Sequence, residues 1–167
     1  MSSCANHVTW LNTTVSLPTR SGGSVATAFE RRPLLSGAIS GLLLAASFPP
    51  LDLGWVAFVA LVPLALVSRT DDRRKIAFAG ASFGVIFFGC LLYWIRLFGL
   101  PAYVGIVVLE ASIFTLVLCA ALFARRGLPA HLKFVAFALA ILAGEYIRGH
   151  VPFGGFTWGG LAYSQHN

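Results

Sequence analysis

Five long apolar blocks, separated by short polar stretches, dominate the chain from residue 34 onward. They cover residues 34–48, 53–67, 76–95, 100–124 and 134–147. At a helical rise of about 1.5 Å per residue, the third block reaches about 30 Å, the thickness of a hydrocarbon core. The first two blocks reach only about 22 Å each, so they either cross as short spans or form a tight helical hairpin. The pattern predicts an all-α, polytopic transmembrane helix bundle with about five hydrophobic segments.

Composition supports the membrane class and narrows the choice of partners. Apolar residues make up 57% of the chain and charged residues only 11%, whereas soluble domains carry about 25% charged residues. The net charge of +6 comes from short basic clusters between the apolar blocks, and no basic helix face could follow a phosphate backbone. We therefore expect an integral membrane protein that binds no nucleic acid.

The distribution of Lys and Arg predicts an orientation. Ten of the twelve Lys and Arg residues precede the first block, separate blocks two and three, or separate blocks four and five. Only Arg96 and Arg148 lie on the opposite side. Because cytoplasmic loops carry the excess of positive charge, we expect the N-terminus in the cytoplasm and the C-terminal segment outside.

Three segments follow from this arrangement. Residues 1–32 are rich in Ser and Thr and are expected to form a disordered cytoplasmic leader. Residues 33–149 are expected to form the transmembrane helical bundle. Residues 150–167 are expected to form an extracytoplasmic Gly/aromatic loop, and we expect the chain to be truncated there. Alternatively, residues 34–46 are the apolar region of a signal peptide, but the 33-residue approach is long and four more apolar blocks follow.

Small residues and one proline predict details of helix packing. Glycines recur at four-residue spacing as Gly37 and Gly41 in block one and as Gly80 and Gly84 in block three. Such spacing lets helix backbones approach closely in lipid, which predicts a compact bundle. Pro63 predicts a kink in block two.

Glu110 is a carboxylate inside an apolar block and needs an explanation. It lies about ten residues into block four, and so about 15 Å below the outer boundary, where an ionised group needs a partner. Ser82, Tyr93 and Arg96 are the candidate partners. Glu110 is either a proton or substrate relay or a packing residue.

Glu145 and Arg148 stand three residues apart at the outer end of block five, so they share a helix face and can pair. Gly149 then permits a sharp exit from the helix. An aromatic and glycine-rich loop follows, which is either an interfacial belt or the lining of a lipid-facing cleft. No metal site is expected, because His150 and His166 have no acidic or cysteine companion at ligand spacing.

Six short motifs occur in order along residues 34–167, and together they resemble one family. The motifs are Phe48-Pro49-Pro50, Tyr93-Trp94, Phe98-Gly99-Leu100-Pro101, Glu145-Tyr146-Ile147-Arg148-Gly149, Gly155-Phe156-Thr157-Trp158 and Tyr163-Ser164-Gln165. In this order and spacing the chain resembles the membrane portion of apolipoprotein N-acyltransferases, the bacterial enzymes that add the third acyl chain to lipoproteins. Two positions depart from the family pattern, which usually has proline in place of Thr157 and glycine in place of Ala162.

The resemblance implies an acyltransferase of the bacterial inner membrane. It implies transfer of an acyl chain from membrane phospholipid to the N-terminal S-diacylglyceryl cysteine of a lipoprotein, without a cofactor. The family's nitrilase-like domain supplies a Glu–Lys–Cys triad whose cysteine carries the acyl chain as a thioester. No residue here matches that triad, so we expect no catalytic residue in this chain and an inactive fragment. The lipid-side and substrate-side candidates are Phe48, Pro49, Pro50, Trp94, Glu145, Arg148, Gly149, Phe156, Trp158, Tyr163, Ser164 and Gln165.

Two hypotheses of other classes remain beside this one. The chain could be a non-catalytic membrane module that binds lipid or a partner subunit. It could also be a small transporter with Glu110 at its centre, although no internal repeat or further intramembrane charge supports that role. The oligomeric state is not predicted.

Overall fold

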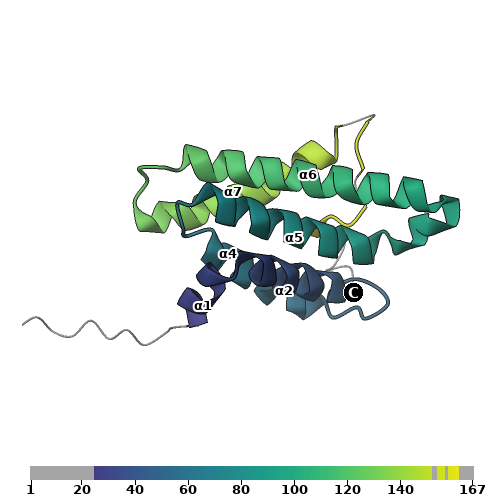
Figure 1. Ribbon diagram of the computed structural model, residues 1–167, viewed down its shortest axis with the longest axis horizontal. Coiled ribbons are helices and arrows are strands. Elements are labelled where there is room, and N and C mark those ends of the chain that lie inside the picture. Colours follow the sequence, from purple (N-terminus) through teal and green to yellow (C-terminus); the bar gives the residue numbers. More distant parts are fainter. Residues whose placement is uncertain (1–24, 152–153, 157, 162–167) are drawn as a thin grey trace, which may run out of the picture.

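The computed structural model describes residues 25–151, 154–156 and 158–161, and in these ranges the chain is all-helical without a β-strand. Figure 1 shows the longer helices packed lengthwise against one another. The helices are α1 (Val25–Arg31), α2 (Pro33–Ala46), η1 (Gly54–Val56), α3 (Ala57–Ala60), α4 (Val62–Val67), α5 (Arg73–Leu91), η2 (Tyr93–Phe98), α6 (Leu100–Ala124) and α7 (Ala130–Arg148), where η denotes a short 3₁₀ helix.

The predicted helical class is confirmed, and each apolar block contains helix. Block four coincides with α6, whereas α5 ends before block three does, because the chain tightens into η2. Within the described residues, α5 and α6 are the two helices long and apolar enough to cross a membrane. This agrees with a membrane protein.

The expectation of a disordered leader is wrong at its C-terminal end, because residues 25–31 form α1. The Ser36 hydroxyl of α2 donates to the Phe29 carbonyl at 2.8 Å and so ties α1 to α2. Residues 1–24 lie outside the part of the chain that the structure describes.

Helix α2 and the α3–α4 segment form an antiparallel hairpin. Pro49 and Pro50 follow α2, and the Leu53 amide donates back across the turn to the Ala46 carbonyl at 3.1 Å. The returning helix is broken between α3 and α4, and Pro63 lies in the first turn of α4, where its missing N–H is tolerated. The predicted kink is therefore confirmed.

Glycines bring α2, α5 and α6 into backbone contact, as their spacing predicts. Gly37 lies directly against the Ala79 carbonyl, and a Cβ at Gly41 would stand 2.7 Å from the Phe83 carbonyl oxygen. A Cβ at Gly84 would stand 2.7 Å from the Cα of Ala111. Any larger side chain at these positions must push two helices apart.

Four buried phenylalanines fill the space between these helices. Phe83 packs against Phe114 with ring centroids 4.6 Å apart, and Phe87 packs against Phe88 at 4.9 Å. All four side chains are at most 7% exposed. The outer faces are also apolar: Phe58, Leu97, Phe98, Leu116 and Phe134 are each at least 69% exposed, which is typical of a surface that contacts lipid.

The two ends of the bundle differ in chemistry. The α1–α2, α4–α5 and α6–α7 connections lie together at the left of Figure 1, and most of the Lys and Arg residues lie in them or in the adjoining helix turns. We call this the basic end. We call the opposite end, formed by η2 and the described residues among 149–151, 154–156 and 158–161, the aromatic end.

Close packing at Gly37 predicts a selective effect of adding one methyl group. Gly37→Ala should lower the free energy of unfolding by about 1–3 kcal/mol, because the methyl must displace the Ala79 carbonyl. Gly105→Ala is the control, since no atom lies within 4 Å of a Cβ at that position of α6. It should be neutral or stabilising by up to about 1 kcal/mol. Thermal unfolding in detergent micelles compares the two, and equal effects would contradict the contact.

Candidate functional site

Arg148, the last residue of α7, is the centre of the candidate site. Its side chain is only 4% exposed, and its Nε donates to the Oε2 carboxylate oxygen of Glu110 in α6. Glu110 is fully buried. This pairing corrects two expectations: Arg148 does not pair with Glu145, and the partner of Glu110 is not Ser82, Tyr93 or Arg96. Instead, Ser82 donates to the Leu34 carbonyl, and Arg96 lies over the Tyr93 ring.

The register of the two helices explains the pairing. Helices α6 and α7 are antiparallel neighbours, and Gly144 lies beside Phe114, which places Arg148 level with Glu110. Glu110 is the eleventh residue of α6, so α7 ends about 15 Å short of the level of Leu100, the first residue of α6. Arg148 therefore lies deeper than the interfacial position that the sequence suggested.

Arg148 also holds the chain that follows α7. Its Nη2 donates to the Trp158 carbonyl at 3.1 Å, and its own carbonyl accepts from the Phe156 amide at 2.7 Å. The guanidinium carbon lies 4.4 Å from the ring centroid of Phe88 in α5. One side chain thus connects α5, α6 and the loop, and its charge is balanced where an unpaired charge would be costly.

Glu145 has a different role from the one expected. Its Oε1 accepts a hydrogen bond from the Leu161 amide at 2.6 Å. Because Glu145 and Arg148 lie one helical turn apart, they bind the two ends of the segment from Phe156 to Leu161. The described residues of this segment lie beyond the end of α7, and irregular backbone inside an apolar bundle needs such hydrogen-bond partners.

Glycine is required where the loop turns back on α7. Gly155 has φ of 86° and lies directly against the Gly149 backbone, so a side chain has no room there. Gly159 has φ of 80° and lies against the Leu91 side chain at the end of α5. The yellow segment of Figure 1 is this loop, and it crosses from α7 toward the end of α5.

Aromatic side chains cover the loop on its outer side. Trp94 and Trp158 are 42% and 58% exposed, and their ring centroids lie 5.7 Å apart. Phe156 is half-buried and packs against the hydrophobic core. Exposed tryptophans next to an apolar surface are typical of a membrane–water boundary or of contact with acyl chains.

The Phe48-Pro49-Pro50 motif lies one layer away from Arg148. Phe48 is 4% exposed and packs on Phe87 with ring centroids 5.8 Å apart, and Phe87 in turn contacts Phe88 beneath Arg148. Both prolines are exposed and end α2. Phe48 therefore packs beneath the site through Phe87 and Phe88, whereas Pro49 and Pro50 lie outside it.

The space around the ion pair is small. A cavity of about 20 Å³ lies against Phe88, Glu145, Arg148 and Gly159, which is room for about one water molecule. The second oxygen of Glu110, Oε1, has no hydrogen-bond partner among the described residues.

Three of the candidate site residues, Tyr163, Ser164 and Gln165, lie outside the described residues. Across the described ranges, no three His, Cys, Asp or Glu side chains gather as they would around a metal ion.

These observations define the class of protein: an all-helical apolar bundle in which a buried ion pair holds a glycine- and aromatic-rich loop. The family model for the apolipoprotein N-acyltransferase N-terminal domain matches residues 40–167. The chain is also 34% identical over 148 residues to the apolipoprotein N-acyltransferase of Geobacter metallireducens. That alignment covers 83% of this chain and 28% of the relative, so the chain spans under a third of the relative's length. The chain belongs to the apolipoprotein N-acyltransferase family, as the motifs indicated.

The ion pair predicts strong coupling between two residues 38 positions apart. Arg148→Leu or Glu110→Leu alone should destabilise the bundle by about 3–5 kcal/mol, because each leaves a buried charge without its partner. The double variant should be destabilised by clearly less than the sum of the two. Unfolding in mixed micelles, carried through the complete cycle, measures this coupling.

Arg96→Leu is the control for the loss of a cationic side chain at the aromatic end. Arg96 is exposed, with its guanidinium carbon 4.8 Å from the ring centroid of Tyr93, so its loss should cost only about 0.5–1 kcal/mol. Additive effects of Glu110→Leu and Arg148→Leu would show that the pair does not hold the two helices together.

Proposed function

We propose that this chain is the membrane-embedded, lipid-binding part of an apolipoprotein N-acyltransferase. Such an enzyme transfers an acyl chain from a phospholipid to the N-terminal S-diacylglyceryl cysteine of lipoproteins in the bacterial inner membrane. The observation that carries the proposal is the loop that Glu145 and Arg148 hold in place at the aromatic end. Two of the six motifs by which the chain resembles the family meet there: the segment 145–149 holds the loop, and the loop contains the segment 155–158.

The proposal includes a topology with five apolar segments, namely α2, α3–α4, α5, α6 and α7, that alternate in direction. The gathering of Lys and Arg at one end supports a cytoplasmic basic end and an extracytoplasmic aromatic end. Helix α2 and the α3–α4 segment are short, and the hairpin that they form packs along α5. In this topology the anchored loop faces the side on which lipoproteins are acylated.

In this role the aromatic end binds acyl chains, and the chemistry is done elsewhere. Trp94 and Trp158 offer exposed rings to the tails of the phospholipid donor and of the diacylglyceryl acceptor. The Glu–Lys–Cys triad of the family is supplied by its nitrilase-like domain, and Cys90 and Cys119 lie within α5 and α6 at positions that match no member of that triad. We expect the 167 residues alone to bind these lipids without turning them over.

The ion pair bears on the transporter hypothesis as well. A transporter would need Glu110 to exchange protons or substrate with an aqueous path. Glu110 is instead fully buried and paired with Arg148. This gives Glu110 a structural role and favours the acyltransferase over the transporter.

The lipid contact is tested in a full-length enzyme in which residues 40–167 replace the matched part of the Geobacter metallireducens relative. Trp158→Ala should raise the KM for the phospholipid donor by about fivefold to tenfold, since burial of an aromatic side chain against a lipid tail contributes about 1–1.5 kcal/mol. The kcat should change little, because the proposal gives Trp158 a role in lipid binding and none in the chemical step. Transfer from a fluorescent phospholipid to a diacylglyceryl peptide measures both constants.

Trp55→Ala is the matched control, because Trp55 is 68% exposed but lies in η1, outside the candidate site. Equal effects of the two substitutions on KM would contradict the assignment. Turnover by residues 1–167 alone would also contradict it.

A further inference from the structure

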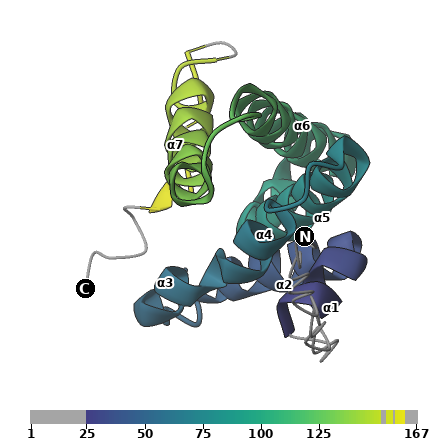
Figure 2. The same cartoon turned by 90° about the vertical axis from the view of Figure 1, so that its left-hand side faces the viewer.

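A second hollow lies at the opposite end of the bundle, away from the site described above. It is a groove of about 500 Å³ between α4 and α7, at the basic end that faces the viewer in Figure 2. Small-molecule sites typically have volumes of about 300–1,000 Å³. The groove is lined by Val62, Ala65, Leu66, Ser68, Arg69, Arg125, Lys133, Phe134 and Phe137.

The lining of this groove is divided into an apolar and a cationic part. Val62 and Leu66 of α4 face Phe134 and Phe137 of α7 across it. Positive charge comes from Arg69 after α4, Arg125 at the end of α6 and Lys133 in the first turn of α7. An occupant that satisfies both parts must combine an anionic group with a hydrocarbon chain.

Arg125 is the residue of the groove lining that would gain most from a bound anion. Its side chain is 3% exposed, and its Nη2 reaches the Thr70 carbonyl only at 3.5 Å. Its Nε has no hydrogen-bond partner among the described residues. Burial lowers the pKa of Arg125, and the negative charge of Asp71 opposes that shift only in part. A buried guanidinium donor without a partner is costly, and an anion in the groove would remove that cost.

The charges that face this site do not cancel. Asp71 lies 3.9 Å from the Lys133 ammonium, so it offsets part of that charge, and it is exposed beside the groove rather than in its lining. A phosphate is the common anion that several convergent cationic donors bind well.

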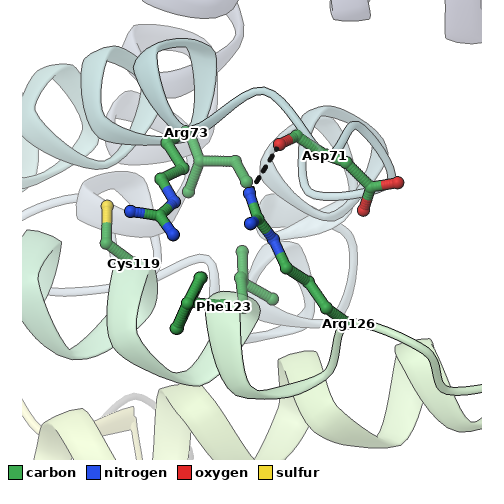
Figure 3. A pocket seen from close by; sticks show the side chains of 7 residues that line it. Asp71, Arg73, Cys119, Phe123 and Arg126 are labelled. Atoms are coloured by element: carbon green, nitrogen blue, oxygen red, sulfur yellow. Dashed lines mark hydrogen bonds between the residues drawn. The ribbon is translucent and has the colours of Figure 1, made fainter.

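A neighbouring pocket at the same end contains arginines that already have partners within the protein. Figure 3 shows Arg73 and Arg126 turned toward the ring of Phe123, with guanidinium carbons 4.0 Å and 4.7 Å from its centroid. Arg126 also donates to the Asp71 carbonyl at 3.4 Å. That pocket encloses only about 10 Å³, which leaves no room for a lipid. Its arginines therefore differ from Arg125, because they contact protein groups and need no added anion.

We propose that the α4–α7 groove binds one anionic phospholipid from the leaflet at the basic end. Its phosphate lies among Arg69, Arg125 and Lys133, and an acyl chain runs along the apolar wall of α4 and α7. Basic pockets between membrane helices favour such lipids by charge. The proposal rests on the membrane topology given under Proposed function. It concerns a lipid bound at the end of the bundle opposite the loop that would receive the acyl donor.

Native mass spectrometry of the full chain in detergent tests the proposal, with phosphatidylglycerol and phosphatidylcholine of identical acyl chains as probes. The parent chain should retain phosphatidylglycerol preferentially. Arg69→Gln with Lys133→Gln should reduce that retention by about tenfold, because each basic side chain near an anionic headgroup contributes about 1 kcal/mol before screening. The matched control is Arg74→Gln with Lys75→Gln, which removes the same charge from the basic end outside the groove.

A steric variant tests the apolar part without a change of charge. Val62→Trp fills the groove from a half-exposed position at the start of α4, and it should reduce phosphatidylglycerol retention as strongly as the loss of the two charges. Glycerol phosphate, which has the charge without the tails, should not displace the lipid.

Three results would overturn the proposal: equal retention of the two lipids, equal loss in the groove and control variants, or displacement of the lipid by glycerol phosphate. Alkaline carbonate extraction of membranes separates this failure from that of the proposed function. A chain that stays in the membrane but shows any of the three results contradicts the lipid site alone, whereas a chain that is extracted contradicts both.

Discussion

The ion pair between Glu110 and Arg148 joins two helices where neither side chain reaches solvent. Two charges in an apolar interior cost much less when they meet each other and further contacts hold them in place. Arg148 has such contacts with the Trp158 carbonyl and the ring of Phe88. The position at which α7 ends and the path of the loop beyond it both depend on this one contact.

The bundle is built so that the pair can form. Glycine contacts draw α2, α5 and α6 together until backbone touches backbone, and this places Phe88 beside the end of α7. The resulting molecule has different chemistry at its two ends. At one end, a loop rich in glycine and tryptophan is held by Glu145 and Arg148; at the other, arginines and a lysine surround an apolar groove.

Much of this could be predicted from the sequence, because helices, their glycine contacts and the break near Pro63 depend on local patterns. The partner of Glu110 could not, because it depends on the vertical offset between α6 and α7. One signal was present: Glu110 lies fourteen residues before the end of α6, and Arg148 lies eighteen after the start of α7. Measured along the helix axes from the α6–α7 connection, the two residues differ in height by four residues, or about 6 Å. An arginine side chain can reach across that distance. The binding of Leu161 by Glu145 left no such pattern.

Fluorine NMR of the chain labelled with fluorotryptophan tests most directly whether the ion pair holds the loop. The Trp158 ring lies 5.7 Å from the ring of Trp94, so its resonance should be displaced from that of the free amino acid. In Arg148→Leu the Trp158 resonance should move to the free value, while that of Trp55 in η1 stays in place. A Trp158 resonance that is unchanged by Arg148→Leu would contradict the account, because the loop would then be held without the pair.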